Sequence, residues 1–131
     1  MTKIVLVTHG KFGEELLRSA EMIVGSQNDV YSVCLSCEES PECFGSKLDV
    51  ALQDIGHEDT LILIDLFGGT PCNVAARWVR DPQIECVTGV NLPMLIETLM
   101  MRDSSTAAEL AEVAAQAGKE SVRNLGPLLN K

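Results

Sequence analysis

The stretch "KIVLVTHGKFGEELL" (Lys3–Leu17) decides the fold class, because it joins a buried strand directly to a helix. Ile4 to Val7 is an unbroken apolar run rich in β-branched residues, which is typical of a strand covered on both faces. From Gly10 to Val24 the apolar residues follow helical spacing, and Gly25 ends that pattern. His9 stands at the junction, where a titratable ring calls for a chemical explanation.

The alternation of strands and helices continues along the chain. Further strands are expected at Val30–Leu35, Thr60–Ile64 and Ile84–Val87. Further helices are expected at Pro41–Ile55, after Thr70 as a cap with Pro71 in the first turn, over "LPMLIETLM" with Asn91 as its cap, and at Ala107–Val122. Every connection between strands is long enough to hold a helix, which favours a parallel sheet with crossover helices.

The pattern predicts an α/β fold made of a single domain over residues 1–131. We expect a three-layer sandwich in which a mostly parallel sheet has helices on both faces, as in flavodoxin-like doubly wound proteins. The C-terminal segment "NLGPLLNK" (residues 124–131) has two interpretations. It is either a short last strand, antiparallel at the edge of the sheet, or a loose end.

Composition excludes several classes of protein. The chain is 46% hydrophobic, which is enough for a real core, and no run of about 18 apolar residues could span a membrane. The formal charge of −9 argues against a nucleic-acid partner. An acidic surface suits a basic protein partner, or it serves solubility alone. The five cysteines and the lack of a secretory leader predict reduced thiols in a cytoplasmic protein.

Unusual residues follow three of the expected strands. His9 ends the first strand, Asp65 follows the third, and "TGVNLP" follows the fourth. If the first and third strands are neighbours, His9 and Asp65 emerge side by side. A carboxylate bonded to one ring nitrogen fixes the tautomer and leaves the other nitrogen free as a nucleophile or base.

Helix starts next to these residues add donors for an anion. One helix follows His9 and Gly10, and another follows the turn Gly68-Gly69-Thr70, where glycines let the backbone approach a ligand. This arrangement predicts phosphoryl transfer through a histidine. The alternative is a capped, hydrogen-bonded strand-end histidine beside an ordinary tight turn.

Three separated motifs resemble the IIA component of the mannose-family sugar phosphotransferase system. They are "THG" after the first strand, "DLFGGTPCNVAAR" after the third and "VTGVNLPMLIETLMMRD" after the fourth, and the likeness covers nearly the whole chain in order. Val7 stands where relatives often have glycine, and Gly13 where alanine or serine is common. Neither departure touches His9 or Asp65.

The resemblance implies a phosphocarrier. His9 would accept a phosphoryl group from the carrier protein HPr and pass it to the IIB component, which serves the membrane subunits IIC and IID. Asp65 would hold the Nδ1–H so that Nε2 carries the phosphoryl group, while Gly10, Gly68, Gly69 and Thr70 would bind its oxygens. Phe67 and Pro71 are candidate partner contacts. No metal or cofactor is expected.

The resemblance also implies an assembly. Members of the family form homodimers in which a last strand crosses to the other subunit, and the tail from Glu120 is compatible with this. The chain resembles a free-standing IIA component, because no linker and IIB domain follow. The transported sugar is recognised by the membrane subunits, so nothing in this sequence names it.

The other polar residues are given structural interpretations. Cys34 and Cys37 form a CxxC pair, which we interpret as ordinary thiols because a tetrahedral metal site needs about four ligands. Cys72, in the first turn of a helix, is either oxidation-sensitive or a small packing residue. His57 is expected in an exposed loop. Met94, Leu95, Leu99 and Met100 are spaced as one core face of a helix.

Two rival functions remain at this point. A regulatory module would use the same phosphohistidine to signal to partners outside transport, and transfer to a IIB protein distinguishes the two. A flavodoxin-like domain for a nucleotide or a flavin would have a longer phosphate loop and aromatic rings at the strand ends. Neither Tyr31 nor Trp78 falls at an expected strand end.

Overall fold

One parallel sheet of four strands organises the chain in a computed structural model that describes all 131 residues. The strands are β1 (Lys3–His9), β2 (Val30–Leu35), β3 (Thr60–Ile64) and β4 (Ile84–Thr88). Their order across the sheet is β2-β1-β3-β4, and every pair is parallel. The predicted α/β class and sheet are confirmed, but there is no antiparallel edge strand.

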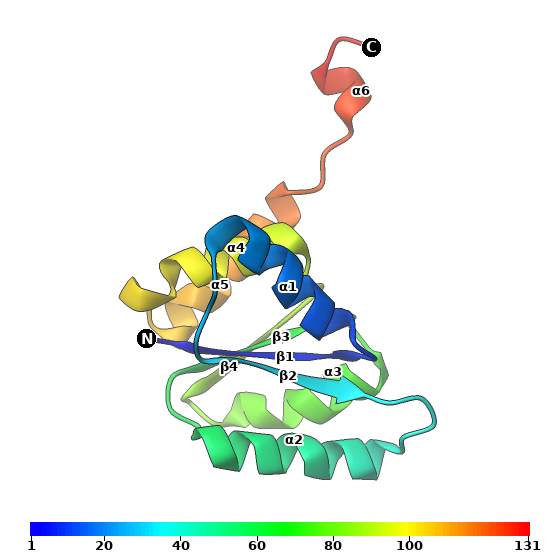
Figure 1. Cartoon of the computed structure of the whole chain (residues 1–131), viewed down its shortest axis with the longest axis vertical. Coiled ribbons are helices and arrows are strands. Elements are labelled where there is room, and N and C mark those ends of the chain that lie inside the picture. The colour runs from blue at the N-terminus through cyan, green and yellow to red at the C-terminus, as the bar shows by residue number, and fades with distance from the viewer.

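Helices cover both faces of the sheet, as Figure 1 shows. One face carries α1 (Phe12–Val24), α4 (Leu92–Met101) and α5 (Ala107–Glu120), and the other carries α2 (Pro41–Ile55), α3 (Gly69–Ala75) and the 3₁₀ helix η1 (Ala76–Arg80). The 3₁₀ helix η2 (Arg102–Ser104) links α4 to α5, and α6 (Leu125–Leu128) lies near the C-terminus. The predicted three layers are therefore present.

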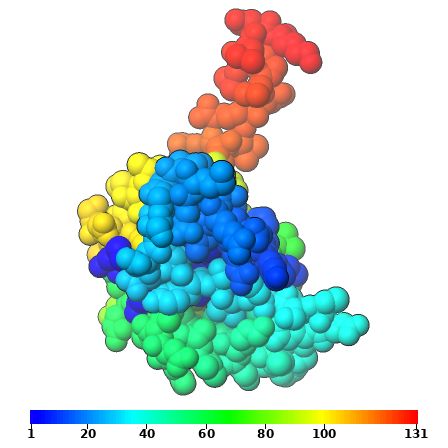
Figure 2. All heavy atoms as spheres, in the orientation of Figure 1, coloured from blue at the N-terminus to red at the C-terminus, as the bar shows by residue number.

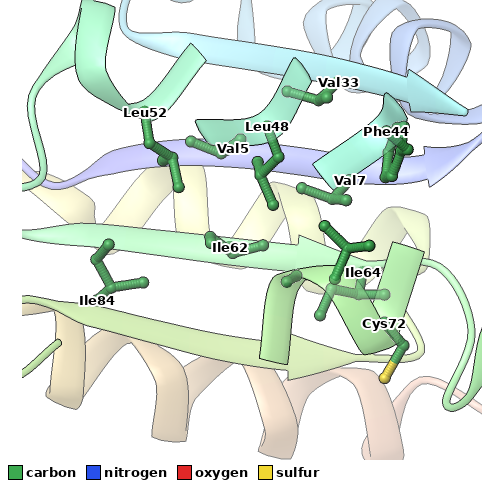
Figure 3. Close-up of a cluster of buried hydrophobic side chains, with 12 residues drawn as sticks. Val5, Val7, Val33, Phe44, Leu48, Leu52, Ile62, Ile64, Cys72 and Ile84 are labelled. Carbon is green, nitrogen blue, oxygen red and sulfur yellow. The ribbon is translucent and has the colours of Figure 1, made fainter. Parts of the chain in front are cut away.

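The core consists of two separate layers because successive strand residues point to opposite faces. In β1, Val5 and Val7 pack on the side of α2 and α3, where Figure 3 shows them opposite Phe44 and Leu48. Ile4 and Leu6 pack on the side of α1, α4 and α5. All four β1 side chains are fully buried, and each contributes about 1.5–3 kcal/mol through burial. This two-sided burial explains the unbroken apolar run.

The strand order creates a switch point between β1 and β3. The chain leaves β1 towards β2 on one side and returns to place β3 on the other side. The register pairs Val7 with Ile64, so His9 and Asp65 both lie just beyond the last paired residues. The sheet itself therefore brings these two residues to the same edge, where α/β proteins bind their ligands.

Two details of the helices differ from the sequence prediction. The Asn91 side chain does accept from the Met94 N–H at 3.0 Å, which confirms this cap. Thr70 is not a cap, because α3 already begins at Gly69 and Gly68 occupies the cap position without a side-chain bond. Met100 is not a core residue, because 65% of it is exposed while Met94, Leu95 and Leu99 are buried.

The C-terminal tail projects away from the body of the molecule, as Figure 2 shows. Its short helix α6 stands in place of the possible last strand. Four large aliphatic residues of the tail are exposed: Val122, Leu125, Leu128 and Leu129. None of the helices combines the length and the apolar character that a membrane span needs.

Candidate functional site

His9 and Asp65 are joined by two hydrogen bonds at the switch point of the sheet. Asp65 Oδ2 accepts from the backbone N–H of His9 at 2.8 Å and lies 2.9 Å from the ring Nδ1. Because a carboxylate can only accept, this contact places the proton on Nδ1 and a lone pair on Nε2. The predicted pairing of the two side chains is confirmed.

The exposure of the two side chains is unequal. The His9 side chain is 48% exposed, whereas the Asp65 side chain is only 12% exposed. The carboxylate is therefore largely withdrawn from water while the ring reaches into solvent. Asp65 holds the ring through Nδ1 while the rest of the ring is exposed, so His9 can contact a second protein and keep its orientation.

The Asp65 carboxylate has an unused oxygen. Oδ1 is buried and has no hydrogen-bond partner, and it is the one buried side-chain nitrogen or oxygen of the chain in this condition. An unpaired buried polar atom costs about 1–3 kcal/mol, so the fold bears a penalty at this position. Both hydrogen bonds of the Asp65 carboxylate therefore go to His9, and no other donor competes for it.

The start of α1 is held against the end of β1. The buried Thr8 hydroxyl accepts from the Gly13 N–H at 2.9 Å, and this bond replaces a conventional cap because Lys11 at the cap position has none. A Cβ on Gly13 would lie 3.1 Å from both Leu6 Cβ and Thr8 Oγ1. Glycine at position 13 thus allows close packing that fixes the turn carrying His9.

Glycines shape the space in front of the ring. Gly68 and Gly69 have φ values of +88° and +81°, and Gly10 has +52°, which is a region that other residues rarely adopt. A Cβ on Gly69 would lie 3.6 Å from His9 Cε1 and 3.7 Å from Nε2. Its absence leaves free the volume next to the reactive nitrogen.

Comparison with known proteins identifies the family. The family model described as "PTS system fructose IIA component" matches residues 3–115. The chain belongs to the mannose family of phosphotransferase-system EIIA components. The resemblance drawn from the three sequence motifs is confirmed.

Individual relatives agree with this assignment. The chain is 36% identical to the fructose-specific EIIA component of Bacillus subtilis over 84% of its own length and 77% of that protein. It is 39% identical to the mannose-specific EIIAB component of Escherichia coli over 93% of its own length, but it spans only 39% of that longer protein. The solved mannose/sorbose-specific IIA subunit of Enterococcus faecalis matches with a TM-score of 0.87, at 38% identity, over 94% and 93% of the two chains.

The remaining predicted site residues of this EIIA chain differ in exposure. Thr70 is the second residue of α3, on the glycine turn, and its hydroxyl makes no hydrogen bond within the chain. Phe67 is 84% exposed, so it is free to contact a partner. Pro71 is buried in the first turn of α3, so the structure does not support its prediction as a partner contact.

Sequence reasoning missed two apolar residues near the site. Leu66, beside Phe67, is 56% exposed, and Phe12, at the start of α1, is 46% exposed. Together with Phe67 they give the carboxyl edge of the sheet an apolar surface. The sequence signal was present, because an apolar residue directly after a strand end has no neighbouring core to enter.

The cysteines of the EIIA chain show no shared site. Cys37 and Cys43 are exposed, Cys72 is buried within the core, and all five thiols are free. Burial raises the pKa of Cys86 to about 12, and burial together with Glu14 raises the pKa of Cys34. No cluster of three or more His, Cys, Asp and Glu residues is placed to hold a metal ion.

His57 is not the freely exposed loop residue that was predicted. Its ring lies edge-on to Trp78 with the ring centroids 4.7 Å apart, and its Nδ1 is 3.4 Å from Asp81 Oδ2. It joins the loop before β3 to the segment that follows η1. This contact lies at the amino edge of the sheet, away from His9.

Proposed function

We propose that this chain is a phosphocarrier in which His9 accepts a phosphoryl group from phospho-HPr and passes it to a IIB component. The observation that carries the proposal is the pair of hydrogen bonds from His9 to Asp65 Oδ2. They direct Nε2 outwards from a half-exposed ring. A carrier needs this combination, because the nucleophile must be oriented before the partner arrives and accessible when it does.

The transfer is a displacement at phosphorus. The Nε2 lone pair of His9 forms a new N–P bond while the N–P bond of the donor histidine breaks and its electrons return to the donor ring. The Nδ1 proton stays in its bond to Asp65, whose charge stabilises the ring as it becomes positive. In the second transfer His9 is the leaving group: a nucleophile of IIB forms the new bond to phosphorus while the N–P bond of His9 breaks and its electrons return to Nε2.

The glycine turn supports the phosphoryl group in this proposal. The open volume beside Gly69 receives it, and the backbone N–H groups at the start of α3, with the unused Thr70 hydroxyl, are the donors for its oxygens. Gly10 follows the ring with a φ of +52°, which favours glycine, and a Cβ there would meet nothing within 4 Å, so the space beside it is open. No metal ion or cofactor takes part in the proposed steps.

The proposal places the chain in a larger assembly. It works in the cytoplasm as a homodimer and serves the membrane subunits IIC and IID through IIB. The exposed aliphatic residues of the tail are consistent with a dimer, because they have no cover within one chain.

Phosphotransfer with purified proteins tests the proposal. The chain is incubated with phosphoenolpyruvate, enzyme I and HPr, and intact mass is followed for an acid-labile gain of about 80 Da, the mass of one phosphoryl group. Wild type and His57→Ala should gain it, and His9→Ala should not. Addition of a purified mannose-family IIB component should then remove the label. A wild-type chain that stays unlabelled would falsify the proposal.

A further inference from the structure

The chain contains two histidines, and each lies beside an aspartate at one edge of the sheet. His9 Nδ1 is 2.9 Å from Asp65 Oδ2 at the carboxyl edge, and His57 Nδ1 is 3.4 Å from Asp81 Oδ2 at the amino edge. The two side chains are similarly accessible, with 48% and 36% of their surface exposed. His57 is therefore an internal reference that shows what the surroundings of His9 add.

Only the His9 ring is held in one tautomer. Asp65 Oδ2 lies 2.9 Å from its Nδ1 and also accepts from the backbone N–H of His9 at 2.8 Å. The 3.4 Å contact of His57 is longer than an ordinary N–H···O hydrogen bond, and Asp81 Oδ1 accepts from the Gln83 N–H at 2.9 Å instead. The Nε2 lone pair thus points outwards at His9, whereas the proton of a neutral His57 ring is free to occupy either nitrogen.

The two histidines also lie at opposite kinds of helix end. His9 comes three residues before the start of α1, and His57 comes two residues after the end of α2 (Figure 1). Free N–H groups at a helix start attract phosphate, whereas carbonyl groups at a helix end repel it. The last carbonyl oxygens of α2, those of Ile55 and Gly56, lie 3.1 Å and 2.9 Å from Lys3 Nζ. An incoming phosphoryl group therefore meets N–H donors at His9 and carbonyl oxygens at His57.

The space beside the ring distinguishes the two histidines as well. A Cβ on Gly69 would lie 3.7 Å from His9 Nε2, and the glycine leaves this volume free. The His57 ring instead has Trp78 edge-on to it, with the ring centroids 4.7 Å apart. One chain thus supplies an oriented nucleophile, N–H donors and room for the phosphoryl group before any protein partner docks.

We propose that His9 also accepts a phosphoryl group directly from acyl phosphates, the small mixed anhydrides of phosphate and a carboxylic acid. This inference rests on the part of the proposed function that makes His9 a phosphoryl acceptor, and it goes beyond that function because HPr is not needed. Since the chain already orients the nucleophile, the donor has to supply only the phosphoryl group and a good leaving group. Acyl phosphates supply both, because a carboxylate leaves readily as an anion.

The step is balanced without a further reactant. The Nε2 lone pair forms the N–P bond while the P–O bond to the acyl oxygen breaks, and the electron pair of that bond leaves with the carboxylate. The Nδ1 proton stays in its bond to Asp65, whose negative charge stabilises the ring as it becomes positive. The small donor reaches Nε2 because the His9 side chain is half-exposed.

Acetyl phosphate is the probe, added to the purified chain without enzyme I or HPr. Intact mass is followed for an acid-labile gain of about 80 Da, and lysine acetylation by the same reagent is recognised by its gain of about 42 Da and its resistance to acid. His57→Ala leaves only His9, and His9→Ala leaves only His57, so these variants compare the two histidines in the same fold. Asp65→Asn and Asp81→Asn make the same change beside each ring.

His57→Ala and Asp81→Asn should gain label at the wild-type rate, whereas His9→Ala should gain it about 100-fold more slowly. Asp65→Asn should lose most of the advantage of His9, because the charge that stabilises the phosphorylated ring is gone. Label that follows His9 and Asp65 in this way, and that is lost again when a purified IIB component is added, would support the inference.

Two results overturn the inference and leave the phosphocarrier role intact. The first is a chain that HPr labels and acetyl phosphate does not, because the protein donor must then complete the site. The second is equally slow labelling of both histidines by acetyl phosphate, which is the ordinary reactivity of an exposed imidazole. A chain that neither donor labels would contradict the proposed function itself, and this inference with it.

Discussion

The two ends of β3 carry aspartates that use their oxygens in different ways. Before the strand, Asp59 accepts from Thr2 Oγ1 at 3.0 Å and from the Ala107 N–H at 2.9 Å, with one bond on each carboxylate oxygen. After the strand, Asp65 has both of its bonds on Oδ2 and leaves Oδ1 buried without a partner. The five residues of β3 separate a carboxylate with both oxygens bonded from one with an unpaired oxygen.

The difference separates stability from reactivity. At the amino edge, Asp59 ties the N-terminus and the start of α5 to the sheet, and buried Arg102 donates to the backbone oxygens of Asn28 and Asp29. At the carboxyl edge, Asp65 Oδ1 has no hydrogen-bond partner, at the place where a phosphoryl group and a partner would enter. We therefore expect changes at one edge to alter unfolding and changes at the other to alter transfer.

The largest expected effect is that of Asp65→Asn on transfer. An amide oxygen at the position of Oδ2 can still accept from both His9 donors, but the negative charge that stabilises the phosphorylated ring is gone. We expect the rate of HPr-dependent labelling to fall about 100-fold, or about 2.7 kcal/mol in the barrier. Rapid-quench labelling measures the rate, and urea unfolding should show a much smaller change. An unaltered rate would remove Asp65 from the mechanism.

Asp59→Ala should show the opposite behaviour at the other end of the strand. It removes two acceptors that join segments distant in sequence, and we expect the free energy of unfolding to fall by about 2–3 kcal/mol. Labelling of the folded protein should keep its wild-type rate. Urea denaturation and labelling of the same sample measure both. Asp59→Asn is the milder control because asparagine tolerates the positive φ of 46° at this position.

Gly69→Ala tests whether the open volume by the ring belongs to the transfer. The new methyl group would sit 3.7 Å from Nε2, in the space assigned to the phosphoryl group, and the backbone φ of +81° would be strained. We expect about a tenfold slower labelling and a loss of about 1 kcal/mol in stability. The same substitution at Gly25, with φ +84° but far from the ring, should cost stability alone.

The smallest expected effect concerns one glutamate at each edge. Hydrogen bonds from the Ser36 backbone and from Lys47 lower the pKa of Glu39, and the pKa of Glu58 is lowered chiefly by its own backbone N–H and by Lys3. A lowered pKa stabilises the fold above the ordinary value of 4.5 and ceases to do so as the pH falls through the lowered value.

Glu39→Gln and Glu58→Gln should therefore be slightly less stable than wild type at neutral pH and equal to it in more acidic solution. Thermal unfolding from pH 7 down to pH 3 measures the difference. A gap that widens as the pH falls would contradict the assigned cause.

The sequence predicted the sheet and the central pair for a clear physical reason. Alternating burial on two faces produces the unbroken run in β1, and the ends of parallel strands must meet at one edge, which brought His9 and Asp65 together. Pattern reasoning failed where a single residue has no periodic signal. Gly68 rather than Thr70 caps α3, because a positive-φ glycine served where a capping side chain was expected.

The amino-edge cluster could not be predicted from sequence. The bond from Thr2 to Asp59 spans 57 residues, and Arg102 reaches Asn28 across 74, so tertiary packing alone decides which polar groups meet. The prediction also failed for Met100, because it lies five residues after Leu95 and six after Met94, which at 3.6 residues per turn turns it away from the buried face of α4. The two interpretations of residues 124–131 could not be decided from sequence, because no strand within the chain is left for this segment to pair with.

The separation of His9 and Asp65 by 56 residues has a consequence for the folding of the chain. A chain that has not yet paired β3 with β1 has the histidine but lacks the carboxylate that fixes its tautomer. Non-local contacts of this kind form late, after α1, β2 and α2 have been spaced between the two strands. The rate at which a refolding chain gains acid-labile phosphate would therefore report when β3 pairs with β1.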